Sequence, residues 1–255
     1  MTSADRDFGV EVESLGSLRL VRLAHGKANA IDVEFCRGLT KTLKELAATD
    51  AVRAIVLTGR GRIFSAGVDL VRLTEESTDY LFDFLPPLEE MFEACITLPC
   101  PLVAAINGHS IAGGGVLACA ADYRVLAETA KVGVPELQVG VPFPPFAMEI
   151  VRASVPAPRF REIVIRGQLV QGAEAVSSGF ADEVLPAPQV EARAIEVATE
   201  LATIPAPAYR LFKVDWRRPL IARARSASFD DVAAGWRHPS VREAVTRYVE
   251  RTLSR

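Results

Sequence analysis

The stretch LTGRGRIFSAGVDL, residues 57–70, contains the first of two glycine loops that decide the fold. It overlaps a short apolar segment, AIVLT at residues 54–58, which is typical of a buried strand. Gly67 lets the backbone turn sharply and approach a ligand closely. The residues that follow indicate a helix, for which Asp69 is a suitable N-cap. The stretch therefore predicts a strand, a tight loop and a helix in succession.

A second loop of this kind lies in NGHSIAGGGVLACAAD, residues 107–122, directly after the strand-like LVAAI at residues 102–106. Three consecutive glycines, residues 113–115, leave backbone N–H groups uncovered at the start of a predicted helix, where an anion is favoured. Either loop alone is more often an ordinary tight turn, and neither is a P-loop. Two loops that each follow a strand can, however, aim their N–H groups at one point, as an oxyanion hole requires.

Strand-like and helix-like segments alternate over the first half of the chain. Residues 17–24 alternate apolar and polar side chains, as a half-buried strand does. Asp32 is placed to cap a helix that continues to about residue 48, and a longer helix is expected over residues 80–98. Residues 123–127 indicate another strand. This order predicts a layered α/β domain.

The pattern changes after about residue 188, beyond which no strand-like segment remains. Helices are expected over residues 190–203, 206–216 and 238–253. The sequence therefore predicts a core over residues 1–189 and a C-terminal helical region over residues 190–255. Between the strands and this region, VPFPP at residues 141–145 is expected to be a rigid apolar loop, because proline fixes φ and removes a donor.

Composition excludes several classes of function. The chain has 255 residues, a formal net charge of −3 and no long basic run, which argues against a nucleic-acid partner. Its apolar stretches are too short to span a membrane, and its first residues have no apolar signal segment. Four cysteines and three histidines show no metal-like spacing. We expect no metal, no membrane partner and a reducing, cytoplasmic location.

Together with KANAID, residues 27–32, and VPELQVG, residues 134–140, the two loops resemble the crotonase superfamily, also called the enoyl-CoA hydratase/isomerase family. The resemblance runs in consistent order from about residue 16 to residue 185. It implies an α/β fold built as a spiral of ββα units, followed by helices that form trimers. The expected assembly is a homotrimer or a dimer of trimers. The implied partner is an acyl-CoA thioester, whose coenzyme A is part of the substrate, so no separate cofactor is expected.

The resemblance also assigns roles to residues. In that family two backbone N–H groups hold the thioester oxygen, and here they fall on Val68 and Gly114. The backbone around residues 27–30 and 65–68 would hold the adenine end of coenzyme A. The complete set of residues expected to contact the substrate is Lys27, Ala28, Ala30, Ser65, Ala66, Gly67, Val68, Asp69, Leu70, Gly113, Gly114, Leu117, Pro135, Val141 and Lys213, with Glu136 as the catalytic acid–base.

The acids separate the possible reactions. Hydratases of the family carry two catalytic glutamates, and the corresponding positions here are Leu117 and Glu136. Adding water requires a group that orients it and a group that delivers a proton, and leucine does neither. Moving a double bond from C3 to C2 needs one carboxylate in a dry pocket, which raises its pKa. This pattern is similar to that of the mitochondrial 3,2-trans-enoyl-CoA isomerases, so the favoured prediction is an enoyl-CoA isomerase.

Three alternatives remain open from the sequence. The first is an enoyl-CoA hydratase in which an unforeseen group replaces the missing glutamate. The second is another crotonase-type thioester enzyme, such as a hydrolase or decarboxylase, because one fold supports many reactions. The third is an acyl-CoA binder or assembly protein without turnover. The retained Glu136 argues against the third.

Several residues also have ordinary structural explanations. Asp69 is expected to cap a helix, His109 to be a hydrogen-bonded loop residue, and Asp122 to fix the following strand. Lys213 fits a solvated basic face and a contact to a coenzyme A phosphate equally well. An apolar series on the helix over residues 80–98 fits either core packing or an acyl pocket. Its members are Tyr80, Phe82, Phe84, Leu85, Leu88, Met91 and Phe92.

Overall fold

The largest sheet has six strands in the order β1-β2-β4-β7-β9-β11 in this computed structural model, which describes residues 9–77 and 79–252. The first two strands form an antiparallel hairpin, and all the other pairs are parallel. The strands are β1 (Val10–Leu15), β2 (Leu18–Leu23), β4 (Ala54–Gly59), β7 (Leu102–Ile106), β9 (Tyr123–Ala127) and β11 (Glu183–Leu185). Every residue of β4 and β7 is buried, as expected of central parallel strands.

Two small sheets lie beside the large one. One pairs β10 (Val132–Gly133), β8 (His109–Ile111) and β5 (Ile63–Ser65), and the other pairs β3 (Ala30–Ile31) with β6 (Gly67–Val68). Along the chain, a strand of the large sheet is followed by a strand of a small sheet and then by a helix. The unit β7, β8 and α4 (Gly113–Cys119) and the unit β9, β10 and α5 (Glu136–Val139) follow this order. The spiral of ββα units expected from the sequence is therefore confirmed.

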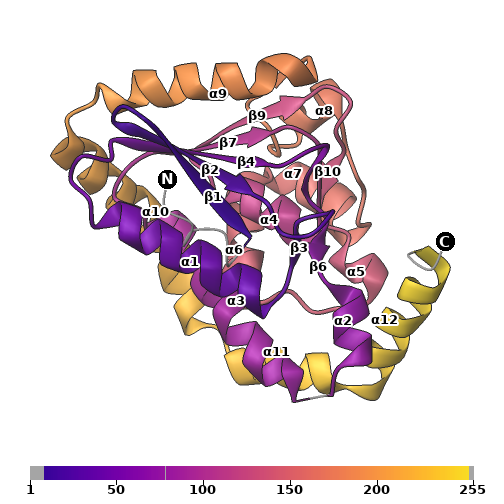
Figure 1. The fold of residues 1–255 in the computed structure, drawn as a ribbon. Helices are drawn as coiled ribbons and strands as arrows, with labels where there is room; N and C mark the ends of the chain where they lie inside the picture. The colour runs from indigo at the N-terminus through magenta and orange to yellow at the C-terminus, as the bar shows by residue number, and fades with distance from the viewer. Residues whose placement is uncertain (1–8, 78, 253–255) are drawn as a thin grey trace.

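Helices cover both faces of the large sheet (Figure 1). Below it in this view lie α1 (Val33–Ala47), α3 (Tyr80–Thr97) and α6 (Pro145–Ser154), and above it lies α9 (Ala187–Ala202). Asp32 caps α1 as expected, because its Oδ1 accepts a hydrogen bond of 2.8 Å from the Phe35 N–H. The boundary expected between residues 189 and 190 falls inside α9. Since α9 packs on β4, β7 and β9, it belongs to the layered α/β structure.

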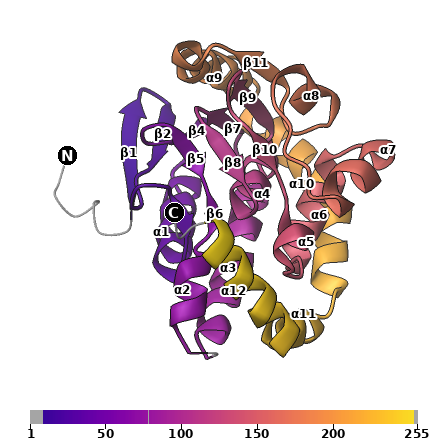
Figure 2. The same cartoon turned by 90° about the vertical axis from the view of Figure 1, so that its right-hand side faces the viewer.

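The remaining C-terminal helices are α10 (Ala206–Ser226), α11 (Phe229–Arg237) and α12 (Pro239–Thr252). The first continues beyond its expected end at residue 216. α11 was not among the expected helices, and the Ser228 hydroxyl caps it by accepting a hydrogen bond from the Asp231 N–H. α12 runs between α2 (Leu70–Glu75) and α5 (Figure 2) and contacts both. A Cβ atom on Gly140 would lie 2.7 Å from the Ala244 Cβ, so α12 packs closely on the end of α5.

The segment between α6 and β11 is formed by α7 (Ala157–Phe160), the π-helical turn Arg161–Ile165 and α8 (Gly172–Ser177). Within residues 9–77 and 79–252, no helix is both long and apolar enough to cross a membrane.

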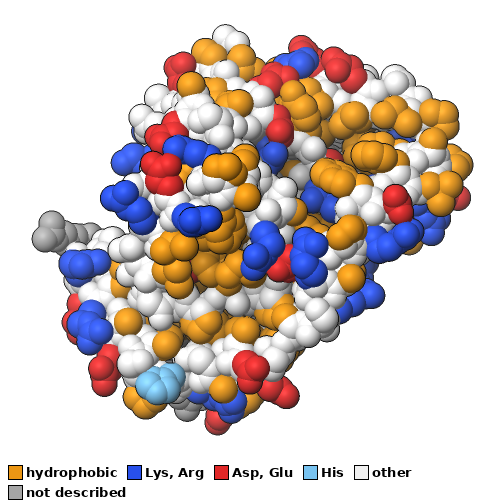
Figure 3. All heavy atoms as spheres, turned by 180° about the vertical axis from the view of Figure 1, so that it is seen from behind, with side chains coloured by type: hydrophobic (Ala, Val, Ile, Leu, Met, Phe, Trp, Pro, Cys, Tyr) orange, Lys and Arg blue, Asp and Glu red, His pale blue; other side chains and the backbone are white. Residues whose placement is uncertain are grey.

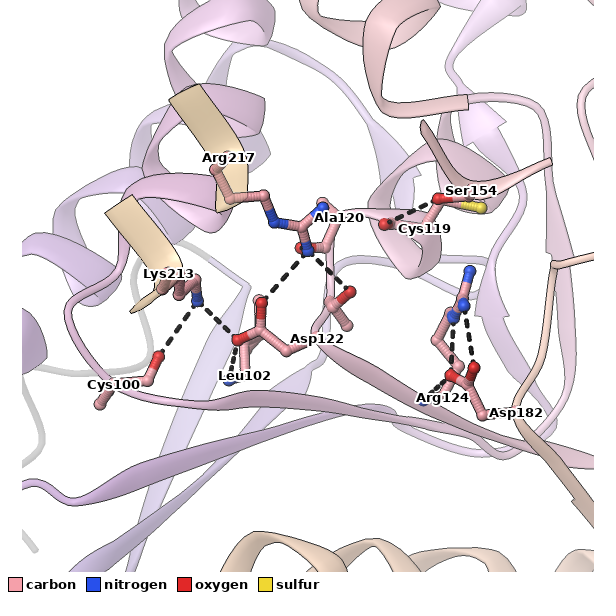
Figure 4. A network of polar contacts seen from close by, with 11 residues as sticks. Cys100, Leu102, Cys119, Ala120, Asp122, Arg124, Ser154, Asp182, Lys213 and Arg217 are labelled. Atoms are coloured by element: carbon pink, nitrogen blue, oxygen red, sulfur yellow. Dashed lines mark hydrogen bonds and ion pairs between the residues drawn. The ribbon is translucent and has the colours of Figure 1, made fainter. Parts of the chain in front are cut away.

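Lys213 does not lie on a solvated basic face (Figure 4). Only 2% of the residue is exposed, and its Nζ donates to Asp122 Oδ2 at 2.6 Å and to the Cys100 carbonyl at 3.1 Å. Arg217, one turn further along α10, donates to Asp122 Oδ1 at 3.1 Å. The buried ammonium group of Lys213 anchors α10 to the core. It therefore lies neither on a solvated face nor at a position where it could contact coenzyme A, and both expectations are wrong.

Asp122 has the structural role expected of it. Besides Lys213 and Arg217, its Oδ2 accepts a hydrogen bond of 2.9 Å from the Leu102 N–H at the start of β7. A buried carboxylate needs such partners, because an unpaired charge away from water is costly. Figure 4 also shows the neighbouring pair of Arg124 and Asp182, which ties β9 to the residue before β11.

Candidate active site

A cavity of about 300 Å³ lies where the ends of several elements converge. Its walls come from the loop before β3, from β6 and α2, from α3 and α4, from α5 and the proline loop after it, and from α11 and α12. The volume is within the range typical of small-molecule sites. Most of the lining is hydrocarbon. On the face opposite to that of Figure 1, hydrophobic side chains gather in a hollow at the middle of the molecule (Figure 3).

The two glycine loops meet at this cavity. A Cβ atom on Gly113 would lie 3.7 Å from the Val68 nitrogen, and one on Gly67 would lie 3.1 Å from the Gly113 nitrogen. At Gly114 a Cβ atom would lie only 2.4 Å from the Ser65 carbonyl oxygen. The backbones therefore approach so closely that Gly67 and Gly114 leave no room for a side chain. Glycine at these positions serves the contact between the loops as well as the turn.

The N–H group of Val68 points away from β3. β3 and β6 pair in parallel with Ile31 opposite Val68, and the Ile31 carbonyl accepts a hydrogen bond of 3.0 Å from the Asp69 N–H. In a parallel ladder the residue between two bonded neighbours turns its own N–H to the other side. Because Val68 lines the cavity, its N–H is on the side where the second loop lies.

The N–H group of Gly114 is at the beginning of α4. Gly113 and Gly114 are the first two residues of this helix, and the first intrahelical hydrogen bond runs from Val116 N–H to the Ala112 carbonyl at 3.0 Å. The earlier N–H groups consequently have no acceptor within the helix. Ala112 precedes them with φ +53° and ψ −126°, a conformation that a side chain rarely adopts. This strained residue turns the chain so that α4 begins at the cavity.

Glu136 brings a carboxyl group to the same cavity. The residue opens α5, only 7% of it is exposed, and its Oε2 has no hydrogen-bond partner among the described residues. Burial raises the pKa of this carboxyl to about 8, although a hydrogen bond from its own backbone N–H acts in the opposite direction. A carboxyl with such a pKa exchanges a proton readily near neutral pH.

Asp69 also lines the cavity, but its side chain is already engaged. Its Oδ1 accepts a hydrogen bond of 3.0 Å from the Arg72 N–H and so caps α2. The expected structural role of Asp69 is confirmed. His109 is exposed, and its Nδ1 accepts a hydrogen bond of 3.0 Å from the Lys131 N–H. The expected hydrogen bond is therefore present, but His109 belongs to β8 and not to a loop, and it is outside the cavity lining.

Leu117, at the position where hydratases of the family carry a catalytic glutamate, lies deeper than expected. Leu117 is completely buried and is absent from the lining, whereas its neighbour Val116 lines the cavity. α4 therefore presents an apolar surface to the cavity, but through Val116. The residues that both the sequence and the structure place at the cavity are Ala28, Ala30, Ala66, Gly67, Val68, Asp69, Leu70, Gly113, Pro135, Glu136 and Val141.

Four other expected contact residues are not part of the cavity lining: Lys27, Ser65, Gly114 and Leu117. Lys27 is exposed beside Ala28, and the Ser65 hydroxyl donates to the Asn29 carbonyl at 2.7 Å. Ser65 thus stabilises the conformation of the first loop through this hydrogen bond. Lys213, as described above, belongs to the anchor of α10 and lies outside this site as well.

Sequence reasoning missed much of the apolar wall. Leu88 and Phe92 of α3 line the cavity, so part of the apolar series on this helix serves the site while Phe84, Leu85 and Met91 pack in the core. The helical spacing of the apolar residues identified Leu88 and Phe92 as candidates. The remaining lining residues carried no such signal, since only tertiary contacts bring them here. They are Val71, Ile111, Ala112, Val139, Pro142, Pro144, Ala147, Trp236 and Tyr248.

Among the described residues, no three His, Cys, Asp or Glu side chains are grouped so that they could hold a metal ion. Of the cavity-lining residues that the structure describes, those with ionisable side chains are Asp69, Glu136 and Tyr248.

The chain has extensive similarity to known acyl-CoA enzymes. Residues 13–254 match the family model described as enoyl-CoA hydratase/isomerase. A putative enoyl-CoA hydratase of Thermus thermophilus is 34% identical over 190 residues, which cover 73% of this chain and 75% of that protein. The human mitochondrial enoyl-CoA delta isomerase 1 is 26% identical over 248 residues, which cover 95% and 82% of the two chains.

Solved structures are similar over nearly the whole chain. The crystal structure of the human mitochondrial delta3-delta2-enoyl-CoA isomerase matches with a TM-score of 0.90 at 26% identity, covering 95% of this chain and 97% of that one. An enoyl-CoA hydratase from Mycobacterium marinum matches with a TM-score of 0.81 at 28% identity, covering 89% and 98%. The family match, the relatives and the convergence of two backbone loops on a buried carboxyl agree: the chain is an acyl-CoA enzyme of the enoyl-CoA hydratase/isomerase family, with the crotonase fold.

Proposed function

We propose that this protein is an enoyl-CoA isomerase that moves the double bond of a 3-enoyl-CoA to the conjugated 2-position. One observation carries the proposal: among the described residues, Glu136 is the only acid of the cavity lining with a buried carboxyl oxygen that has no hydrogen-bond partner. The apolar wall around it favours the neutral acid and a dry reaction, so the proton that Glu136 takes from substrate stays available for return.

The reaction proceeds in two proton transfers. The Glu136 carboxylate removes a proton from C2, and the electrons of the C–H bond move toward the thioester carbonyl. The resulting dienolate oxygen accepts hydrogen bonds from the N–H groups of Val68 and Gly114. Protonated Glu136 then gives the proton to C4, and the double bond ends between C2 and C3. Each backbone donor is expected to contribute a factor of about 10²–10³ to the rate, as donors of this kind do elsewhere.

The same lining argues against hydration. Water addition needs a second acid–base group to hold the attacking water. α4 offers Val116 at the cavity and Leu117 in the core, and the Asp69 carboxylate is occupied by the N-terminus of α2. The relatives include hydratases as similar as the isomerases, so hydration is the second candidate function. Within the described lining the one other acid, Asp69, is committed to capping α2 through its Oδ1, and this favours the isomerase.

The test is a direct assay with purified protein. A 3-enoyl-CoA is supplied, and the growth of the conjugated 2-enoyl-CoA thioester is followed by its ultraviolet absorbance. A 2-enoyl-CoA is supplied separately, and the 3-hydroxyacyl-CoA is quantified by chromatography. We expect rapid isomerisation and hydration at least about 10²-fold slower, the lower bound for losing one acid–base group. Hydration as fast as isomerisation would refute the one-acid mechanism.

Coenzyme A is proposed to enter beside the first loop. The exposed Lys27 precedes Ala28, and Ala28, Ala30 and residues 66–68 belong to the cavity lining, so a cation lies beside this part of the cavity and suits the phosphates of coenzyme A. Replacing Lys27 with Ala is expected to weaken acyl-CoA binding, and increasing salt is expected to reduce the difference between the two proteins.

The protein is further proposed to form a homotrimer, with a dimer of trimers as the larger alternative. α10 exposes Leu211, Phe212, Val214 and Trp216, although its other face is anchored by Lys213 and Arg217. Hydrophobic side chains are visible at the surface on the side where α10 lies (Figure 3). Apolar patches of this kind mark contact surfaces. Light scattering after size-exclusion chromatography measures the mass, and a monomer at micromolar concentration would refute the assembly.

A further inference from the structure

Trp236 separates two cavities. It lines the candidate active-site cavity together with Glu136, and it also lines a smaller pocket of about 30 Å³ between α2, α11 and α12. The smaller pocket is otherwise formed by Leu73, Thr74, Ser77, Leu81, Arg237, Val241, Arg242 and Val245. Within the part of the chain that the structure describes, Trp236 is the sole residue common to both linings. Trp236 therefore lies between the two cavities and is here called the partition.

The partition is held in place from both sides. Trp236 is only 5% exposed. A Cβ atom on the preceding Gly235 would lie 3.1 Å from the Pro142 Cγ, so α11 packs closely on the proline loop. On the other side, the Arg237 guanidinium lies 4.7 Å from the centre of the Phe82 ring and donates to the Ala233 carbonyl at 3.1 Å. A buried aromatic ring on a backbone fixed at both neighbours is a wall and has little freedom to move aside.

The partition is also at the end of the cavity where an acyl chain would finish. Figure 1 shows α11, which carries Trp236, at the lower edge of the molecule, with β3, β6 and α5 above it. Ala28 and Ala66 beside β3 and β6, Val68 of β6 and Glu136 of α5 belong to the same cavity lining. Leu88 and Phe92 of α3 and Ala147 of α6 add hydrocarbon to this lining. A thioester held at Val68 would thus extend its hydrocarbon chain along α3 and α6 toward α11.

We propose that Trp236 sets the maximum acyl chain length, so that the site takes acyl-CoA thioesters whose unbranched hydrocarbon chain ends at the indole ring. This inference rests on the proposed function only in that the cavity binds an acyl-CoA. Each methylene that enters the apolar cavity strengthens binding about three- to fourfold, and a methylene that meets the indole adds nothing. The gain in affinity with chain length therefore ends where the hydrocarbon chain reaches Trp236, and one side chain sets this limit.

Binding of saturated acyl-CoA thioesters tests the proposal without any turnover. Isothermal titration calorimetry is carried out with a series from butanoyl-CoA to tetradecanoyl-CoA. For the unaltered protein, affinity is expected to rise by about three- to fourfold per methylene up to one chain length and then to stop rising. In Trp236→Ala the two cavities join, and this limit is expected to move by about two carbons or more. An unchanged limit in a folded Trp236→Ala protein, or no limit in the unaltered protein, overturns the proposal.

Two further variants keep the test decisive. Trp236→Phe keeps an aromatic ring and breaks no hydrogen bond, because Trp236 Nε1 has no partner among the described residues. This variant covers the case in which Trp236→Ala does not fold. The chain length at which its affinity stops rising must also increase. If that chain length does not change, the proposal is overturned. Thr74→Phe, added to Trp236→Ala, refills the outer pocket from α2. It is expected to return the limit toward that of the unaltered protein, and a limit that stays long contradicts the shared path.

The outcome does not depend on which reaction the enzyme performs. If a 3-enoyl-CoA is not isomerised but the affinity limit moves in Trp236→Ala, the proposed reaction fails and the role of Trp236 stands. If isomerisation is observed but the limit is the same in all variants, the reaction stands and the role of Trp236 fails.

Discussion

The Lys213 ammonium group and the Asp122 carboxylate lie 2.6 Å apart, although 91 positions separate them in the chain. This contact and the one from Arg217 join α10 to the start of β7 and to the loop before β9. Both partners are almost completely buried, which distinguishes the pair from the many exposed ion pairs on the surface. The stability of the α10 anchor therefore depends on one carboxylate.

Replacing Asp122 with Asn is expected to destabilise the protein by about 3–5 kcal/mol, because it leaves two buried cations without their counter-ion. Urea unfolding followed by circular dichroism measures the change. The matched control is Asp215→Asn, which removes an exposed carboxylate paired with Arg218 on the same helix. That change is expected to cost less than about 1 kcal/mol. Equal effects of the two substitutions would contradict the buried anchor.

Replacing Glu136 with Gln is expected to lower kcat for isomerisation by about 10²–10⁴-fold, because the amide cannot carry the proton between C2 and C4. Binding of a saturated acyl-CoA should change little, since that ligand transfers no proton. Glu128→Gln, at an exposed glutamate outside the cavity lining, is the control and should retain full activity. Full activity in Glu136→Gln would assign the proton transfers to another group.

The rate should depend on pH in a defined direction. Glu136 must be ionised to remove the C2 proton, and burial raises the pKa of its carboxyl to about 8. We therefore expect kcat/KM for a 3-enoyl-CoA to rise with pH and to level off above about pH 8. Initial rates between pH 6 and pH 9.5 measure the profile. A rate that is constant over this range, or that falls as pH rises, is incompatible with Glu136 as the base.

The same carboxyl should make stability depend on pH. Its pKa of about 8 in the folded protein exceeds the ordinary 4.5, so between these values the folded chain keeps a proton that the unfolded chain has lost. The contribution to stability is complete below about pH 4.5 and disappears as pH rises through 8, at about 1.4 kcal/mol per pKa unit. Glu136→Gln should therefore lose less Tm between pH 6 and pH 9 than the unaltered protein. Parallel losses would show that burial does not hold the proton.

Much of the site was predictable from the sequence because its signals are local. Asp32 and Asp69 precede their helices directly and act as caps, and the glycines of the two loops lie where the chain must turn. Such features depend on a few neighbouring residues. The position of Glu136 relative to these loops came from the family resemblance and not from local pattern.

The burial of the Lys213 charge and the contribution of the C-terminal helices to the cavity wall were not predictable in this way. Lys213 has other basic residues nearby, which is the usual pattern of a solvated helix face, and its partner Asp122 belongs to a distant segment. α11 has nine residues and two acidic ones in its first turn, so its apolar face was too short to recognise. Trp236 becomes part of the site only because α11 packs against the proline loop and α3.

The strain at Ala112 leads to a further prediction. Its φ of +53° favours glycine, whereas Ala120 has an ordinary helical φ of −71°. Ala112→Gly is expected to stabilise the protein by up to about 1 kcal/mol, because relief of strain exceeds the entropy that glycine adds to the unfolded chain. Ala120→Gly, the control, should destabilise it by about 0.5–1 kcal/mol or more. Urea unfolding compares them, and destabilisation by both substitutions would remove the argument for strain.

The two N–H groups that we propose as oxyanion donors belong to the main chain, and this has a consequence for how such an enzyme can change over generations. A point mutation replaces a side chain and leaves an N–H group in place, so no single codon change deletes the donor at Val68 or Gly114 unless proline replaces the residue. A single nucleotide change in the codon of Glu136, in contrast, can replace it with one of several residues that cannot carry a proton. In the proposed mechanism the affinity for an oxyanion is thus inherited with the fold, while the choice of reaction is exposed to selection at very few positions. New activities are therefore more accessible by exchange of cavity side chains than by reconstruction of the loops.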